Sequence, residues 1–198
     1  MHSCEIRNIK ASLKLPVVKD FQDILVWCFK TKTRVKKFPN FLMIYLPKSA
    51  RISVFKASSK KTDTKLQHWN ITGVDNFSDL NTIVNIICDL VQVAKENIIG
   101  PTIDNISAKG KLSNQSSLIL ENCAKLCRDI GYSCRINREI TSALHIKPSI
   151  KVQEDKSISG TVLLYSSGNY LLIGCKSNSD CEELTKFLEN LTKEDKDV

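Results

Sequence analysis

Amide and aromatic side chains recur at matched places in the two halves of this chain. A candidate strand near the start of each half opens on an asparagine, in Asn8-Ile9-Lys10-Ala11 and in Asn105-Ile106-Ser107-Ala108. Farther along each half an aromatic residue follows an apolar one, in Val54-Phe55-Lys56-Ala57-Ser58 and in Leu164-Tyr165-Ser166-Ser167-Gly168. An Asn side chain carries hydrogen-bond donors and an acceptor, and an aromatic ring offers a flat apolar face. These groups favour binding over catalysis.

The matched motifs belong to an internal repeat. A third pair, Ile71-Thr72-Gly73-Val74 and Leu172-Ile173-Gly174-Cys175, follows in the same order. The period of roughly 100 residues is too long for a solenoid, whose units run about 20–50 residues. We therefore expect two fused copies of one small α+β unit, residues 1–97 and 98–198, which together form one surface with pseudo-two-fold symmetry. The function is expected on that surface.

The basic charge of the chain lies in its first half. The net charge is +8; residues 1–97 carry 16 Lys and Arg against 8 Asp and Glu, and residues 98–198 carry 13 of each. A one-sided basic charge suits a polyanion partner, most often a nucleic acid. A Lys-rich solvated surface would have the same composition, and charge alone leaves both interpretations open.

Several site classes have no support in the sequence. Zinc sites use paired ligands at short spacing, whereas the eight cysteines include no Cys-x2-Cys pair and the three histidines are scattered. We expect mostly buried free thiols in a reducing compartment. No carboxylate pair, histidine-based nucleophile or phosphate-binding loop stands out, so we expect no enzyme activity, no metal and no cofactor.

The chain also lacks the patterns of a membrane or secreted protein. No apolar run reaches the ~18 residues that a membrane-spanning helix needs, and the first residues are not followed by the apolar core of a signal peptide. We therefore expect a soluble, intracellular protein.

Periodicity predicts the elements of the first half. Alternating residues predict a half-buried strand over 7–15, with Ile9, Ala11, Leu13 and Leu15 inward. Helical spacing predicts a helix over 18–31 and a longer one from an N-cap at Ser78 to about Lys95. Between them we expect strands over 40–46, 50–58 and 68–74, and a polar loop over Ser58–Gln67. The basic run 30–37 is predicted to be a solvated loop that suits phosphate contacts.

The second half repeats this order after Gly100-Pro101, which we take as the boundary between the two halves. We expect a strand over 103–112, helices over 116–130 and 178–192, and strands near 143–155, 160–167 and 169–175. Each half is then strand, helix, three strands, long helix. The helices must cover one face of an antiparallel sheet, and the other face, with Asn8, Lys10, Ser12, Asn70 and Thr72, is left open to water.

These residues resemble the TATA-box-binding protein family over roughly residues 5–192. Residues 163–176, Leu-Leu-Tyr-Ser-Ser-Gly-Asn-Tyr-Leu-Leu-Ile-Gly-Cys-Lys, are similar without a gap to the family pattern Leu-Ile-Phe-x-Ser-Gly-Lys-x-Val-x-Thr-Gly-Ala-Lys. The family's first-strand motif Asn-Ile-Val-Ala is met by Asn8–Ala11. The spacing from Asn8–Ala11 to Phe55 also agrees without a gap, and Lys37-Phe38 falls on the family's basic-Phe pair.

The resemblance implies a saddle-shaped, curved antiparallel sheet with the long helices on its convex face. In the family the concave face lies on a widened DNA minor groove, where pairs of phenylalanines wedge between base steps. Short amide donors suit the acceptors of A·T pairs, and flexible pyrimidine–purine steps unstack at low cost. The resemblance therefore implies binding and bending of an AT-rich promoter in transcription initiation.

The resemblance also implies roles for single residues. Asn8 and Asn105 match the two central asparagines, Phe38 and Phe55 match the wedge pair of the first half, and Tyr165 takes the place of one wedge phenylalanine in the second. Thr72 matches one of two threonines on the groove floor. The residues expected to contact DNA are Asn8, Lys10, Phe38, Phe55, Thr72, Asn105, Lys109, Tyr165, Leu171 and Ile173.

The chain departs from the family pattern at several of these places. Ile173 replaces the other threonine, and Asn70 replaces a valine. Lys10, Ser107 and Lys109 stand where the family has mostly small apolar or hydroxyl residues. No phenylalanine precedes Tyr165 at the expected distance, where Ile146 or Pro148 lies nearest. We expect the first repeat, with its charge and wedge candidates, to bind DNA more strongly than the second.

Other interpretations of these residues remain open. Phe38 and Phe55 could be core aromatics, Phe41 competes with Phe38 for the wedge role, and both asparagines could cap strand edges. The whole chain could be a scaffold that binds a protein through Leu163, Tyr165, Leu171 and Ile173, with weak or no DNA binding. A domain of this fold attached to a glycosylase or ribonuclease is a third hypothesis, for which the chain has little room.

The resemblance further implies protein partners and a compartment. The partners would be transcription factor IIB-like and IIA-like proteins and the RNA polymerase machinery, bound on the helical side. The expected compartment is the nucleus. The Lys, Ile and Asn content also allows a large DNA virus as the source, with a cytoplasmic viral factory as the site of action.

Overall fold

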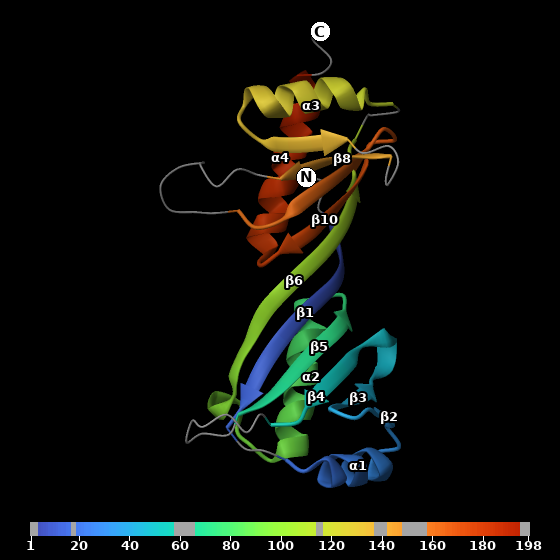
Figure 1. Ribbon diagram of the computed structural model, residues 1–198, viewed down its shortest axis with the longest axis vertical. Coiled ribbons are helices and arrows are strands. Elements are labelled where there is room, and N and C mark those ends of the chain that lie inside the picture. Colours follow the sequence, from blue (N-terminus) through green and yellow to red (C-terminus); the bar gives the residue numbers. More distant parts are fainter. Residues whose placement is uncertain are drawn as a thin grey trace. The chain divides into compact units, whose positions relative to one another are not determined.

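The computed structural model describes residues 4–16, 19–57, 66–113, 117–136, 142–147 and 158–194 (Figure 1). Ten antiparallel strands are hydrogen-bonded in the order β2-β3-β4-β5-β1-β6-β10-β9-β8-β7. The chain divides into two compact units. The first unit is Asn8–Asp104, and the second unit is Asn105–Val198 together with Met1–Arg7. Strands β1 (Glu5–Leu15) and β6 (Ile99–Lys111) contribute residues to both units.

The first unit is a curved run of strands with two helices. After β1 come α1 (Phe21–Lys30), β2 (Arg34–Lys37), β3 (Phe41–Tyr45), β4 (Arg51–Phe55), β5 (Gln67–Val74) and α2 (Phe77–Val91). Short 3-10 turns lie at Pro47–Ser49 and Lys95–Asn97. The second unit repeats this order with β6, α3 (Leu120–Asp129), β7 (Ser133–Ile136), β8 (Ala143–Lys147), β9 (Thr161–Tyr165), β10 (Asn169–Cys175) and α4 (Asn178–Glu194).

Alternation explains the core of each unit. In β1 the inward residues Ile9, Ala11, Leu13 and Leu15 are buried, as expected, and their neighbours are not. In α2 the buried residues follow the helical period, Leu80, Ile83, Val84, Ile87, Leu90 and Val91. This stripe covers the apolar face of the first sheet, and α4 does the same in the second unit with Leu184, Leu188 and Leu191 (Figure 1). On the opposite face the alternate strand residues are half-buried or exposed in each sheet.

Two strands were not expected from the sequence. The basic run 30–37, predicted to be a loop, is divided between the end of α1 and the edge strand β2, which pairs with β3 from Arg34↔Tyr45 to Lys37↔Leu42. Its counterpart β7 pairs with β8. Each half is therefore strand, helix, four strands, helix. Lysines on an edge strand discourage pairing with other chains, so the charge that indicated a loop is also compatible with a sheet edge.

Several predicted boundaries are wrong for local reasons. The N-cap of α2 is Asn76, not Ser78, because the Asn76 carboxamide accepts from the Asp79 backbone N–H at 2.7 Å. The helix ends at Val91 because Gln92 adopts a left-handed backbone, with φ of 57°. Gly100-Pro101 lies inside β6, not in a linker. Most of the predicted Ser58–Gln67 loop lies outside the described residues.

The remaining predicted elements are confirmed. The structure places strands at 41–45, 51–55, 67–74, 161–165 and 169–175 and helices at 21–30, 120–129 and 178–194. Of the predicted strand 143–155, the part up to Lys147 is present and residues 148–157 lie outside the described ranges. In the described part of the chain no helix is long and apolar enough to cross a membrane.

Candidate nucleic-acid interface

The open face of the first unit is built from rows of directly opposed residues. One row runs across five strands through Lys36, Met43, Ser53, Asn70 and Ser12. The next row contains Arg34, Tyr45, Arg51 and Thr72. Their chain neighbours Leu42, Ile44, Ile52, Val54 and Ile71 are buried on the other face. The open face is therefore polar and basic, as the alternation of β1 and β5 predicts.

Three phenylalanines cluster at one end of this face, and we call Phe38, Phe41 and Phe55 the aromatic tip. Phe41 lies directly opposite Phe55 on β4, with ring centroids 5.5 Å apart, and stacks on Phe38 at 4.4 Å. The turn between β2 and β3 positions Phe38, because its N–H donates to the Phe41 carbonyl at 2.9 Å. All three rings are half-buried. They are surface aromatics at the end of a sheet, not core residues.

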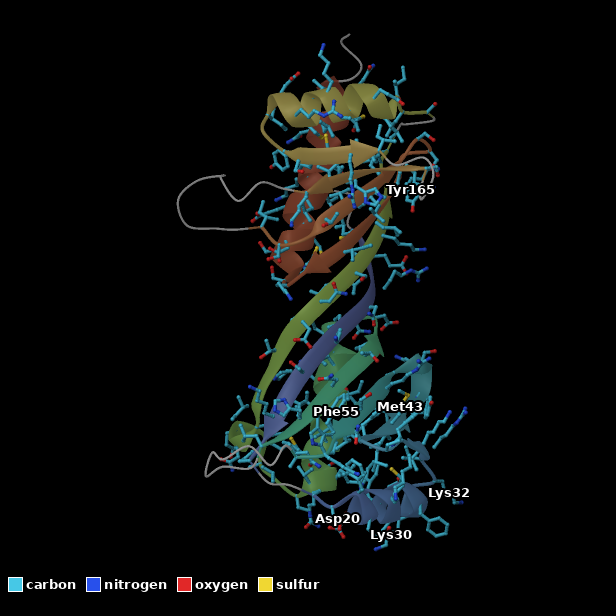
Figure 2. The ribbon with its side chains drawn as sticks, viewed as in Figure 1. Asp20, Lys30, Lys32, Met43, Phe55 and Tyr165 are labelled. Carbon is cyan, nitrogen blue, oxygen red and sulfur yellow. The ribbon has the colours of Figure 1, made fainter. Side chains whose placement is uncertain are left out.

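Figure 2 marks Phe55 at the aromatic tip and Met43 on the neighbouring strand. The ammonium of Lys36 lies 5.1 Å from the centroid of the Phe38 ring. At the other end of β3 the Tyr45 ring lies between two guanidinium groups, Arg34 at 4.7 Å and Arg51 at 5.9 Å. Cation–π contacts of this kind orient long basic side chains at a surface. The face thus presents both aromatic rings and positioned cations.

The two asparagines differ in their hydrogen bonds. The Asn8 carboxamide oxygen accepts from the Gly73 backbone N–H at 2.7 Å. This bond uses one lone pair of the oxygen and leaves the two N–H donors of Asn8 for other partners. Asn105 instead donates from its amide nitrogen to the Ser107 hydroxyl at 3.1 Å. Both residues are half-buried; Asn8 keeps both of its N–H donors for other partners, whereas Asn105 has committed one of its two.

The other expected residues of the first unit lie on the same open face. Lys10 is exposed and Thr72 is half-buried. Ser12 donates from its hydroxyl to the Asp104 carboxylate of β6 at 3.1 Å. Basic side chains on this face and beside the aromatic tip are Lys10, Lys14, Arg34, Lys36, Arg51 and Lys56. Together they give the first unit a strongly positive open side.

The open face of the second unit has the same rows with different side chains. One row runs through Arg135, His145, Leu163, Leu171 and Lys109. In the neighbouring row Ile173 lies opposite Ser107 and is 42% exposed, while Leu171 is 36% exposed. The ammonium of Lys109 lies 3.5 Å from the Glu5 carboxylate, an exposed pair of little energetic weight. This face is more apolar and less charged than that of the first unit.

The second unit has one aromatic residue where the first unit has its tip. Tyr165 is half-buried on the open face (Figure 2), and Ala143 lies directly opposite it, in the place that Phe41 takes opposite Phe55. Ile146, one of the two residues nearest the expected place of a second wedge, is fully buried on the core face. Pro148, the other candidate, lies outside the described residues.

A basic hollow adjoins the aromatic tip. It has a volume of about 520 Å³ and is lined by Lys19, Asp20, Phe21, Lys37, Lys56, Ala57 and Gln67. The ammonium of Lys56 lies 6.0 Å from the Phe21 ring centroid. Three lysines against one aspartate make this flank electropositive, which extends the positive charge of the open face around its edge.

Among the described residues no group of three or more His, Cys, Asp or Glu side chains could hold a metal ion. All eight cysteines are in the thiol form, and Cys28, Cys123, Cys127, Cys175 and Cys181 are buried. Burial raises the pKa of Cys127 to about 12, and a hydrogen bond with Cys175 raises the pKa of Cys181 to about 12. These thiols stay protonated at neutral pH and are poor nucleophiles.

We expect no more than three of the eight thiols to react quickly with a disulfide reagent at pH 8 in the folded protein. The five buried thiols are shielded, and Cys4, Cys88 and Cys134 are half-buried. Absorbance of the released thiolate counts the reactive groups, and the same assay in guanidinium chloride should count all eight. Fast reaction of five or more thiols without denaturant would contradict the buried assignment.

Sequence reasoning missed part of this face. Met43, Tyr45 and Arg51 were not expected as site residues, and Phe41 was considered only as a competitor of Phe38. The signal was present: residues 41–45 alternate, so Phe41, Met43 and Tyr45 lie opposite the buried Leu42 and Ile44. Extending the alternation of β4 to β3 would have placed them beside Phe55.

Comparison with known proteins agrees with this architecture. No family model matches the sequence, and no curated protein matches it. Among solved structures, the TBP of Methanococcus jannaschii is similar, with a TM-score of 0.63 and 16% sequence identity over 97% of this chain and 99% of that chain. Likeness at this identity concerns the fold. The chain therefore shares the fold of that TBP, which confirms the expected α+β class with an antiparallel sheet and helices on one face.

Proposed function

We propose that this chain binds double-stranded DNA in the minor groove of an AT-rich promoter, bends it, and acts in transcription initiation. The observation that supports this most strongly is the aromatic tip at the end of a basic, helix-free face in the first unit. A half-buried ring stack held by backbone hydrogen bonds is suited to wedging between base steps. Flanking lysines and arginines are suited to the phosphates.

The hydrogen bonds of Asn8 support the minor groove over the major groove. With its oxygen turned to the Gly73 N–H at 2.7 Å, Asn8 keeps both of its N–H donors for a ligand. In the minor groove A·T pairs present only acceptors, adenine N3 and thymine O2. Thr72 and Lys10, on the same face, also carry donors. This part of the face therefore complements the floor of an AT-rich groove.

The charge distribution supports unequal roles for the two repeats, which we place at 1–97 and 98–198. The first repeat carries the whole net charge of +8, and the second is neutral. Phosphate contacts supply most of the affinity and its salt dependence. We propose that the first repeat makes most of these contacts, while Asn105, Lys109, Tyr165, Leu171 and Ile173 line the groove under the second.

We assign the helical faces to protein partners. We propose that transcription factor IIB-like and IIA-like proteins and the RNA polymerase machinery assemble there on the DNA-bound protein. Helices α2 and α4 lie on the sheet faces away from the proposed DNA surface, so these partners would not compete with DNA. A promoter-binding role places the protein with the genome, in the nucleus of a eukaryotic cell.

Phe55→Ala tests the proposed function. We expect it to lower affinity for an AT-rich duplex about tenfold or more, because stacking of one base on an aromatic residue is worth about 1–3 kcal/mol. The salt dependence should be unchanged, because no phosphate contact is lost. Fluorescence anisotropy over a salt series, with AT-rich and GC-rich duplexes, measures both, and energy transfer between the duplex ends measures bending.

The matched control is Phe29→Ala, since Phe29 is 85% exposed on α1 and outside the open face. This variant should bind and bend DNA like the unchanged chain. Absence of binding at low salt would rule out a DNA function. Binding that ignores both Phe55 and base composition would reduce it to nonspecific charge attraction.

A protein-binding scaffold is the second candidate. It is favoured by the exposed apolar residues on the open face of the second unit, where Leu171 and Ile173 lie beside Leu163 and Tyr165. Exposed apolar groups of this kind often mark protein interfaces. The low-salt DNA titration separates the two candidates, because a scaffold would keep its fold and bind no duplex.

A further inference from the structure

We propose that the first unit accepts G·C pairs in its half of the DNA site, whereas the second unit requires A·T pairs. This inference rests on the proposed minor-groove function and adds a rule for base composition to it. It assigns the difference to two positions in each unit, Ser53 and Asn70 in the first, and Leu163 and Leu171 in the second.

These four residues occupy equivalent places. Ser53 of β4 lies directly opposite Asn70 of β5, and Leu163 of β9 lies directly opposite Leu171 of β10. Each pair is two residues before an aromatic on one strand, Phe55 or Tyr165, and two residues before Thr72 or Ile173 on the other. Both pairs therefore lie in the middle of an open face, at the same distance along the strands from the aromatic residue.

The polar pair has unused hydrogen-bonding capacity. Within the part of the chain that the structure describes, the side chains of Ser53 and Asn70 make no hydrogen bond, although Asn8 and Ser12 on the adjacent strand β1 do. Both side chains are half-buried and open to a ligand above the sheet. A hydroxyl and a carboxamide each offer a donor and an acceptor.

The minor groove makes this difference matter. A·T pairs present only acceptors there, and a G·C pair adds one donor, the 2-amino group of guanine. Against Leu163 and Leu171 that donor would lose its water and gain no partner, which is costly for a desolvated polar group. Against Ser53 and Asn70 it can donate to the hydroxyl or carboxamide oxygen. The same two side chains can also donate to the acceptors of an A·T pair, so the first unit tolerates both.

The neighbouring rows support the same division. Thr72 adds another hydroxyl next to Asn70, whereas Ile173, 42% exposed, adds another apolar group next to Leu171. The polar and apolar characters thus extend over two adjacent rows in each unit. The DNA sequence that fits both units is asymmetric, with mixed composition permitted at one end and A·T pairs required at the other.

A scan of single base pairs tests the inference. An all-A·T duplex is altered at one position at a time, first to G·C and then to inosine·C, and each affinity for the unchanged chain is measured by competition. Inosine lacks the 2-amino group of guanine, so the pair of substitutions isolates that group. We expect G·C to lower affinity about tenfold in one half of the site and less than twofold in the other. Inosine·C should be tolerated in both halves.

Exchanging the four residues identifies the unit responsible. The double variant Ser53→Leu with Asn70→Val should lose about tenfold for G·C in the tolerant half, measured relative to its own affinity for the all-A·T duplex. The reciprocal variant is Leu163→Ser with Leu171→Asn. It is the matched control and should reduce the loss of affinity that G·C causes in the other half of the site. Circular dichroism confirms that each variant folds, and either variant alone suffices to test the inference.

The outcomes separate this inference from the function on which it rests. If the unchanged chain binds no A·T duplex, the proposed function fails. If it binds, but G·C is penalised equally in both halves, or neither double variant changes its half of the profile, the inference fails and the proposed function stands. If inosine·C lowers affinity as much as G·C does, the inference also fails, because the 2-amino group of guanine would not be the cause.

Discussion

We expect Trp69→Ala to lower the free energy of unfolding by about 3–5 kcal/mol, the usual cost of removing a large core aromatic. Trp69 is fully buried in β5, between Leu13 of β1 and Val54 of β4. Its indole N–H donates to the Gln67 side-chain oxygen at 3.1 Å. Because domains have a total stability of about 5–15 kcal/mol, this variant should be close to unfolding at 37 °C.

Urea unfolding followed by far-ultraviolet circular dichroism measures this loss. Trp27→Ala is the matched control. Trp27 lies half-buried on α1, so its substitution removes less buried side-chain area. A loss for Trp69→Ala no greater than that of the control would show that Trp69 does not anchor the sheet. The result bears on function, since the residue after Trp69 is Asn70 on the open face.

Gly73→Ala is expected to cost about 2–4 kcal/mol, from backbone strain and steric overlap together. Gly73 has a φ of +76°, a backbone angle that residues with a side chain rarely adopt. An added Cβ would also lie 2.5 Å from the backbone oxygen of Ser49. That oxygen belongs to the turn between β3 and β4, so neither partner can move without shifting backbone. The Gly73 N–H also holds the Asn8 oxygen.

Gly131→Ala separates the two causes. Gly131 has a similar φ of +85°, but an added Cβ would meet nothing within 4 Å. We expect this variant to lose about 1 kcal/mol through backbone strain alone. Equal losses for the two variants, measured by urea unfolding, would show that the approach of Ser49 to Gly73 has no energetic weight.

Most of the fold was predictable because alternation and helical spacing are strong in this chain. The strand with Ile9, Ala11, Leu13 and Leu15 and the stripe of α2 follow their periods closely. Strands β2 and β7 were not predictable in the same way, since each has four residues and few apolar side chains. Their pairing with β3 and β8, which only the tertiary structure supplies, decides their conformation.

The candidate site was predictable where strands alternate and not where two strands must be combined. Phe55, Thr72 and Asn8 lie on the open face, as their neighbours' apolar character predicts. The stack of Phe41 between Phe38 and Phe55 depends on the register of β3 against β4, which the sequence does not state. The same holds for Ala143 opposite Tyr165, because the residues between β8 and β9 obscure the spacing.

The assignment of Met1–Arg7 to the second unit has a consequence for biosynthesis. A ribosome makes these residues well before Asn105, where the rest of their unit begins. At about 5–20 residues per second, roughly 100 residues take about 5–20 seconds. At the end of that interval the first unit, continuous from Asn8 to Asp104, has been synthesised and can fold before the second unit is finished. Cys4, whose thiol pKa is raised by a hydrogen bond with Cys181, must wait for the last helix of the chain before its burial is finished.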